Sequence, residues 1–129
     1  MLIEKVNPVA FEPMNEIHNR ELHYVNSLYD AIINGKDIEK AYEEFLNDVK
    51  EHFAFEEKLM EKYNFFAIVP HKMEHARILN ELTELKSRLN DTEYLKDYLT
   101  KAFIPWLENH INTIDTVTAG FFKMINATM

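Results

Sequence analysis

The chain has no cysteine and only two glycines among its 129 residues. Without cysteine it can form no disulfide, no thiolate metal site and no cysteine-bound iron–sulfur cluster. Two glycines are too few for a glycine-rich phosphate loop or for a series of tight hairpins. The sequence also contains no apolar run long enough to cross a bilayer. These absences leave a small, helix-rich domain as the expected product of this sequence.

Acidic residues outnumber basic ones. Lys and Arg total 14 whereas Asp and Glu total 22, which gives a net charge of −8. Because such a domain repels phosphate backbones, we expect no nucleic-acid partner. The apolar share of 47% argues against disorder, and the length suits a single domain over residues 1–129. Residues 1–14 lack a basic end followed by a long apolar stretch, so we expect no signal peptide, no membrane association and a cytoplasmic location.

Four segments carry apolar residues at the threes and fours of helical spacing. The first helix is expected to follow Pro13 and to end at Gly35, a residue type that commonly terminates helices. The second is expected to take Asp37 as its N-cap and to run to about Lys62. The third is expected to begin at Pro70, because proline suits the first position of a helix.

The third helix should end near Leu89, and the fourth should begin after a cap near Thr92. Pro105 lies inside the fourth pattern and predicts a kink, since proline removes one backbone donor. Gly120 is expected to end this helix and to leave a short apolar tail over residues 121–129. Short connections make sequential helices antiparallel neighbours, so the predicted fold is an all-α, up-down-up-down four-helix bundle.

Histidine and carboxylate side chains recur at spacings that place pairs on one helix face. His52 and Glu56 are four residues apart, and so are His71 and His75. Residues four apart lie about 40° from each other around a helix, one turn along, so each pair can point at one object. His18 belongs to the first expected helix at a similar depth.

The fourth expected helix carries His110 and Asp115, five residues apart. That spacing is about 140° around an ideal α-helix, so the two side chains converge only with a long reach or a locally unwound turn such as a π-bulge. Each helix of the bundle therefore presents at least one group that can bind a metal. The candidate ligands are His18, His52, Glu56, His71, His75, His110 and Asp115.

These candidates lie in apolar stretches, where polar side chains need partners. A single histidine on an amphipathic helix is usually an ordinary, partly buried polar residue. Burying so many polar groups without partners would cost several kcal/mol each, and a shared metal removes that cost. We therefore interpret the set as a metal site. The sixth histidine, His23, lies five positions after His18 and is expected on the surface.

Imidazole and carboxylate ligands without thiolate suit Fe, Zn, Mn or Cu. Seven ligands are too many for one tetrahedral zinc ion and suit a pair of ions. If both ions are six-coordinate, they offer about 12 positions. Five histidines, two bridging carboxylates and one bridging oxygen would fill about eleven of them, which leaves one position that a small molecule could occupy.

From about Met14 to Asp115 the sequence resembles the bacterial hemerythrins. The family pattern is a His, then HxxxE, HxxxH and HxxxxD, and all seven positions are filled here at family-like intervals. The resemblance implies two iron ions joined by an oxo or hydroxo bridge, without heme. It places one iron on His71, His75 and His110 and the other on His18 and His52, with two carboxylate bridges from Glu56 and Asp115.

By the same resemblance, O₂ or another small diatomic ligand is the expected partner, bound at the iron that carries two histidines. Phe53 and Trp106 match family pocket positions. We expect a water-free wall around the ligand, formed by Leu22, Phe53, Phe55, Ile78 and Trp106.

Several positions depart from the family pattern. The nearby aromatic residue is Phe11 where members often carry Trp, and Asn15 stands where Asp is common. Glu21 stands where an aliphatic residue usually faces the oxygen site. Because it lies three residues after His18, on the same helix face, we expect Glu21 to reach the two-histidine iron directly or through a water. In the alternative, Glu21 faces solvent or Arg20.

The leading functional hypothesis is reversible O₂ binding for storage, delivery or sensing, without enzymatic turnover. One alternative is a di-iron enzyme that acts as an oxidase or handles peroxide or nitric oxide. Ferritin-like oxidases use glutamate-rich sites with ExxH pairs, whereas histidines here outnumber carboxylates and ExxH is absent around the ligands. A second alternative is an iron- or zinc-binding module without O₂ chemistry.

Overall fold

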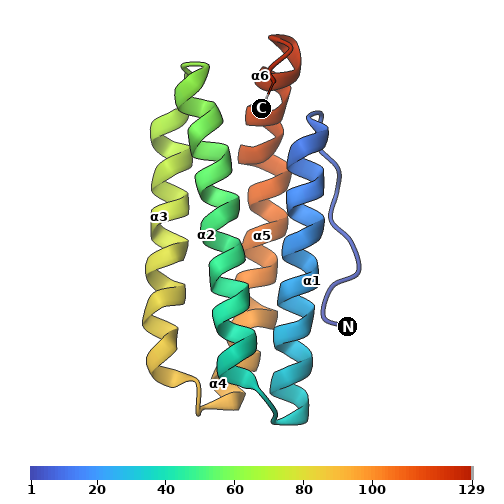
Figure 1. Ribbon diagram of the computed structural model, residues 1–129, viewed down its shortest axis with the longest axis vertical. Coiled ribbons are helices and arrows are strands. Elements are labelled where there is room, and N and C mark those ends of the chain that lie inside the picture. Colours follow the sequence, from blue (N-terminus) through green and yellow to red (C-terminus); the bar gives the residue numbers. More distant parts are fainter. Residues whose placement is uncertain (129) are drawn as a thin grey trace.

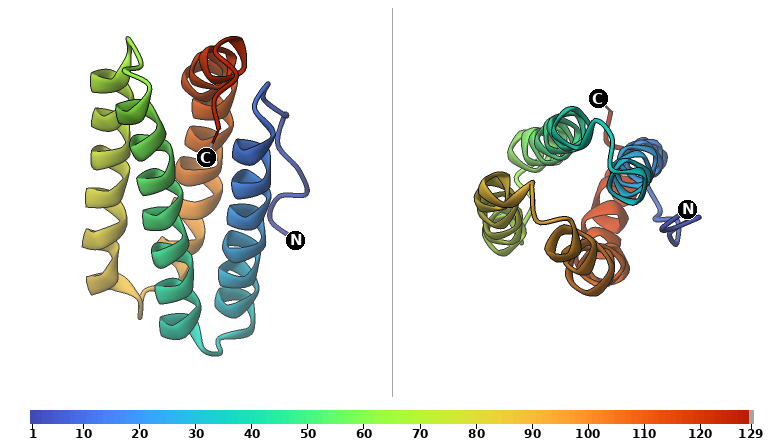
Figure 2. Two further views of the ribbon diagram at one scale, coloured as in Figure 1. Left: turned by 45° about the horizontal axis from the view of Figure 1, so that its top comes forward. Right: turned by 90° about the horizontal axis from the view of Figure 1, so that it is seen from below.

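The structure, a computed structural model, describes residues 1–128, which form four antiparallel helical rods (Figure 1). Viewed along their long axis, the rods surround a common centre (Figure 2), and residues 1–128 contain no strand. The predicted all-α four-helix bundle is confirmed. The elements are α1 (Glu12–Asn34), α2 (Ile38–Lys62), α3 (Ile68–Leu85), η1 (Lys86–Arg88), α4 (Thr92–Tyr98), η2 (Leu99–Phe103), α5 (Ile104–His110), η3 (Ile111–Asp115) and α6 (Thr116–Met124).

The first two turns of the chain follow the sequence prediction in part. Gly35 ends α1 in the left-handed conformation, at φ 64°, which glycine adopts without a steric penalty. Asp37 precedes α2 as predicted, but it is itself left-handed at φ 56° and its side chain makes no capping hydrogen bond. Pro70 is the third residue of α3 rather than the first, because the helix begins at Ile68.

The last rod extends further than the sequence predicted. The Asp91 side chain caps α4 by accepting a hydrogen bond from the Tyr94 N–H at 3.1 Å. Gly120 does not end the rod, since α6 continues to Met124. Burial of Phe122 against the core outweighs the low helix propensity of glycine. Of the predicted tail, residue 129 lies outside the described residues.

Two π-helical turns interrupt the fourth rod. In each, a backbone N–H reaches the carbonyl five residues back: Ile104 to Leu99 in η2, and Thr116 to Ile111 in η3. The first π turn directly precedes Pro105, which becomes the second residue of α5. Proline has no backbone N–H to donate. Near the start of a helical segment, where the hydrogen-bond pattern has just changed, the loss of this donor is tolerated. The rod thus passes Pro105 with an altered register.

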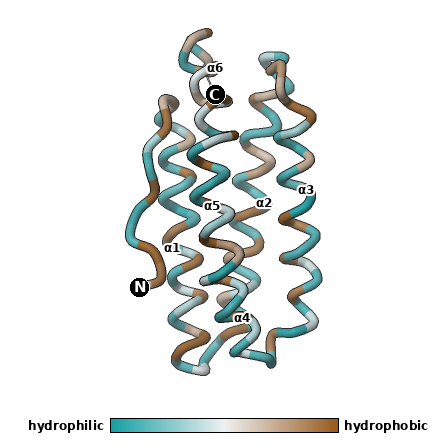
Figure 3. The backbone as a smooth tube through the Cα atoms, turned by 180° about the vertical axis from the view of Figure 1, so that it is seen from behind, coloured by the Kyte–Doolittle hydropathy of each residue, from teal (hydrophilic) through white to brown (hydrophobic). Residues whose placement is uncertain are grey.

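Apolar side chains on the inner faces form two separate clusters, and hydrophobic positions recur along each rod (Figure 3). The larger cluster includes the fully buried Val49, Leu82 and Phe103. The smaller cluster contains Met14, Met60 and Phe122. On α1, α2 and the fourth rod, the buried residues that lie between these clusters are polar. The bundle therefore holds one polar layer between two apolar clusters.

An extended N-terminal segment lies along α1 and is held by two asparagines (Figure 1). The Asn26 Oδ1 atom accepts hydrogen bonds from the N–H groups of Leu2 and Ile3 at 2.9 and 3.0 Å, while its Nδ2 donates to the Ile3 carbonyl at 2.7 Å. Asn15 pairs in the same way with both backbone groups of Val9. Within residues 1–128, no helix combines the length and apolar character needed to span a membrane.

Replacing Asn26 by alanine should release residues 1–3 from α1. Three hydrogen bonds are lost, so we expect the free energy of unfolding to fall by about 1–3 kcal/mol. The amide protons of Leu2 and Ile3 should lose their protection against hydrogen exchange. Asn47 is exposed on α2, and Asn47→Ala is the matched control with unchanged exchange. Equal protection in the Asn26 variant and the wild type would contradict this role.

Candidate metal centre

The seven predicted ligands meet in the polar layer. Each of them is at most 1% exposed, although all are imidazoles or carboxylates. They come from all four rods, one from α1 and two from each of the others, because residues on the inner face of each helix point toward the centre. The residues that the structure brings together are His18, His52, Glu56, His71, His75, His110 and Asp115.

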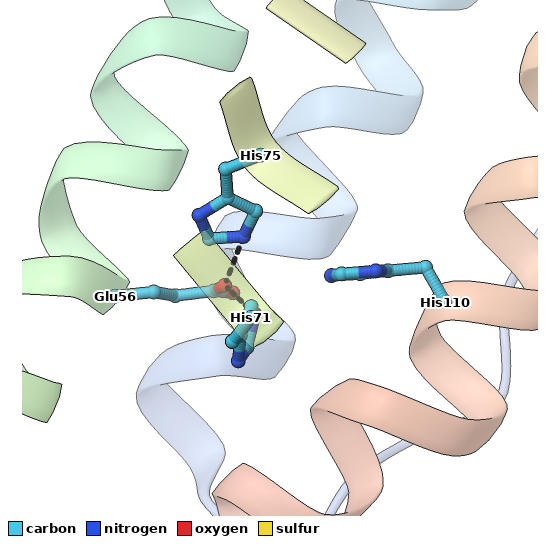
Figure 4. A group of neighbouring side chains, drawn as sticks. All are labelled: Glu56, His71, His75 and His110. Carbon is cyan, nitrogen blue, oxygen red and sulfur yellow. Dashed lines mark ion pairs between the residues drawn. The ribbon is translucent and has the colours of Figure 1, made fainter. Parts of the chain in front are cut away.

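One group of atoms gathers around Glu56, with His71, His75 and His110 pointing toward its carboxylate (Figure 4). The Nε2 atoms of His71 and His75 each lie 3.2 Å from Oε1 of Glu56. The Nε2 atoms of His71 and His110 lie 3.1 and 3.2 Å from Oδ1 of Asp115. Three imidazole nitrogens and an oxygen of Glu56 thus lie within 4.8 Å of one another, and Oδ1 of Asp115 lies close to two of those nitrogens.

A second group gathers around the other oxygen of each carboxylate. The Nε2 atom of His52 lies 2.7 Å from Oε2 of Glu56. The Nε2 atom of His18 lies 3.6 Å from that same oxygen and 3.1 Å from Oδ2 of Asp115. Each carboxylate therefore turns one oxygen to the three-histidine group and the other to the two-histidine group, which is the arrangement of a bridge between two ions.

The π turn η3 lies between His110 and Asp115. An ideal α-helix would separate these side chains by about 140°. Widening one turn lets the fifth residue return toward the face of the first. Hydroxyl groups satisfy carbonyls near this turn, since Thr116 donates to the Ile111 carbonyl at 2.7 Å. The unwound turn anticipated from the five-residue spacing is present.

The donor set fits a metal pair. Among residues 1–128, the buried side-chain atoms without hydrogen-bond partners include Nε2 of His18, His71, His75 and His110, and both oxygens of Asp115. Buried polar atoms are rarely left without partners in native proteins. Here the unpartnered atoms face one another across a small space. Cations between them would satisfy the whole set at once.

The electrostatics of the layer also call for positive charge. Burial lowers the pKa of His18, but the adjacent Asp115 and Glu56 carboxylates outweigh burial and raise that pKa to about 9. For His71, burial likewise opposes the same two carboxylates, which raise its pKa to about 9. Although burial acts to raise the pKa of Glu56, the neighbouring His52, His18 and His71 hold it well below its usual range. The carboxylates thus remain charged and attract cations.

Three side chains that sequence analysis did not assign to these roles hold the outer nitrogens of the imidazoles. The Thr118 hydroxyl accepts a hydrogen bond from Nδ1 of His71 at 2.8 Å. The Glu57 carboxylate accepts one from Nδ1 of His75 at 2.9 Å. Such partners orient the ring so that Nε2 faces a metal. Spacing could not identify them, because Thr118 lies 47 residues from His71 in the sequence.

The third outer partner is Glu21, which the sequence analysis expected near the iron. It is fully buried, and its Oε1 accepts a hydrogen bond from Nδ1 of His52 at 2.8 Å. This contact lies on the side of the ring opposite Nε2, so Glu21 meets the ligand rather than the metal position. The alternative in which Glu21 faces solvent or Arg20 is wrong. His23 is exposed and packs edgewise on Tyr24.

Two aromatic rings cover the three-histidine group. Phe53 stacks on His75 with ring centroids 3.9 Å apart, and Trp106 stacks on His110 at 4.6 Å. The Trp106 indole N–H donates to Glu74 at 3.0 Å. Hydrogen bonds from Arg77 and Trp106 lower the pKa of Glu74 to about 2, so it stays charged and holds the indole in place.

Four of the five predicted wall residues share one apolar cluster. Leu22, Phe53 and Ile78 are buried in the larger cluster, and Trp106 packs against it. Phe55 instead packs against the smaller cluster, so the five residues do not form one continuous cluster, and their role as a wall around the ligand stays a prediction. It follows Phe53 by two residues, which is about 200° around a helix and turns it to another face.

Replacing His75 by alanine should remove one or both metal ions, because the shared carboxylates couple the two groups. Metal analysis by mass spectrometry should show at least one ion fewer per chain than in the wild type. The melting temperature should fall as well, since metal binding stabilises the folded state.

The exposed His23 provides the control for this variant. His23→Ala should retain the wild-type metal content and melting temperature. If His75→Ala retains both, the assignment of His75 as a ligand is wrong.

Comparisons with known proteins find relatives over most of the chain. A family model described as the hemerythrin HHE cation binding domain matches residues 9–121. The bacteriohemerythrin of Aquifex aeolicus is 36% identical over 122 residues, which cover 89% of this chain and 92% of that protein. The bacteriohemerythrin of Pseudomonas aeruginosa (strain LESB58) is 32% identical over 115 residues, 87% of this chain and 72% of that protein. The myohemerythrin of Sipunculus nudus is 35% identical over 66 residues, 50% of this chain and 48% of that protein. No solved structure matches the chain.

Proposed function

The chain belongs to the hemerythrin family, and we propose that it holds two iron ions in the buried centre and binds O₂ there reversibly. The observation that carries this proposal is the division of Glu56 and Asp115 between two groups of imidazoles. One group would hold its iron with three histidines and the other with two. The group with fewer ligands is the one that retains room for a small molecule.

Iron, when bound, supplies the redox chemistry by which O₂ is held. The protein orients the imidazole ligands and excludes water from the ligand site. Hydrogen bonds from Nδ1 of His52, His71 and His75 fix these rings with Nε2 toward the centre. The apolar cluster that contains Leu22 and Ile78 packs on one side of the polar layer. Excluding water and free protons in this way favours release of the ligand as O₂.

The proposed role is storage, delivery or sensing of O₂ rather than turnover of a second substrate. Five imidazoles and two bridging carboxylates occupy most of the positions that two six-coordinate ions offer. A centre filled in this way suits a carrier, since an oxidase needs room for both O₂ and a substrate. A cytoplasmic location and a small diatomic ligand as a partner stay predictions.

Exposing the anaerobically reduced, iron-loaded protein to air should produce a visible absorption band. For a carrier, the band should disappear under vacuum and return on readmission of air over repeated cycles. An enzyme would instead consume O₂ continuously in the presence of a reductant or substrate. A module that binds zinc alone would remain colourless, and either of these outcomes would exclude reversible carriage.

A further inference from the structure

Glu21 is a fully buried charged side chain of α1 that lies outside the seven proposed ligands. Its Oε1 atom accepts the hydrogen bond from His52, and its Oε2 atom has no partner among residues 1–128. A carboxylate in an apolar interior is costly unless positive charge lies close to it. The position of Glu21 therefore requires a nearby source of positive charge.

The adjacent arginine does not meet this requirement. Arg20 donates to Asp48 at 2.7 Å and lies 3.7 Å from Glu51, and its side chain is 46% exposed. Asp48 is itself buried and adds negative charge on that side of Glu21. The remaining source is the centre that His52 faces with Nε2, so the imidazole connects the Glu21 carboxylate to the metal position.

The five imidazoles differ in what holds their outer nitrogens. Among residues 1–128, the Nδ1 atoms of His18 and His110 have no partner, and that of His71 meets the neutral Thr118 hydroxyl. Carboxylates hold the other two. Glu57 on His75 belongs to the three-histidine group, and Glu21 on His52 belongs to the two-histidine group.

The two carboxylates differ in burial. The Glu57 side chain is 28% exposed, whereas that of Glu21 is 0% exposed. Water screens the charge of Glu57, whereas the charge of Glu21 acts through a low-dielectric interior. Glu21 should therefore influence its imidazole more strongly than Glu57 does.

We propose that Glu21 is the positioning residue of the two-histidine metal site. By accepting the Nδ1–H bond, it fixes the His52 tautomer whose Nε2 lone pair faces the ion, and its buried charge makes that nitrogen a stronger ligand. This inference rests on the proposed two-metal centre. It does not depend on O₂ binding, because it concerns any divalent ion held by His18 and His52.

The test uses Zn²⁺, a diamagnetic ion without redox chemistry, titrated into the metal-free protein against a chromophoric chelator. The wild type should bind two ions. Glu21→Gln and Glu21→Leu should each weaken one of the two affinities by about 10–100-fold, the usual effect of removing an outer partner of a ligand. Glu57→Gln is the matched control, and its smaller effect should fall on the other ion.

Nuclear magnetic resonance of the zinc-loaded proteins identifies the affected ion. The Nδ1 proton of His52 should resonate far downfield in the wild type and in Glu57→Gln. It should move upfield in Glu21→Gln and vanish by exchange in Glu21→Leu. The metal-free Glu21→Leu protein should melt no lower than the wild type, since leucine removes an imperfectly paired buried charge. If the Glu21→Leu protein melts at a lower temperature, the zinc affinity of Glu21→Gln decides the test, because glutamine preserves the size of the side chain and one acceptor oxygen.

The role of Glu21 would be overturned if both Glu21 variants kept the wild-type zinc affinities, or if the affinities for both ions fell equally. The proposed two-metal centre would then still stand. A wild-type chain that binds fewer than two zinc ions would overturn the two-metal centre and this inference with it. Two zinc ions bound as expected, together with failure of the iron form to bind O₂, would overturn the O₂ proposal and leave the role of Glu21 in place.

Discussion

Five imidazoles and two carboxylates can share a buried layer only if positive charge lies between them. Each group alone would be expensive to bury, and most of the atoms that face the centre lack hydrogen-bond partners within residues 1–128. Apolar clusters lie on either side of this layer. The bundle therefore acts as the frame of the proposed cation site, and the rotation of each rod is constrained by the side chains that it brings to the centre.

Sequence periodicity was sufficient to predict the four rods and the convergence of their polar residues. His52 with Glu56, and His71 with His75, are four residues apart on one helix. Each pair therefore shares a helix face however the helices pack. Contacts between rods could not be predicted in this way. Glu57 and Thr118 hold imidazoles of another rod, and their positions depend on how the helices rotate against each other.

Other differences arise where tertiary packing outweighs local preference. Glycine is typical of helix ends, yet α6 continues beyond Gly120 because Phe122 is buried in the core. Glu21 shares a face with His18 by spacing alone, but the approach of α1 to α2 places it against His52 instead. Local rules therefore located the right face of the helix but could not select the neighbour that a side chain meets.

The π turn between His110 and Asp115 also has a consequence for sequence comparison. An inserted residue in a regular helix rotates everything beyond it by about 100°. Here the wide turn absorbs the extra residue, so Thr118 and Phe122 still face the interior. A four-residue spacing in a regular helix and a five-residue spacing across a π turn can thus deliver a carboxylate to the same place. Searches that demand one fixed interval at this point would divide chains that build the same centre.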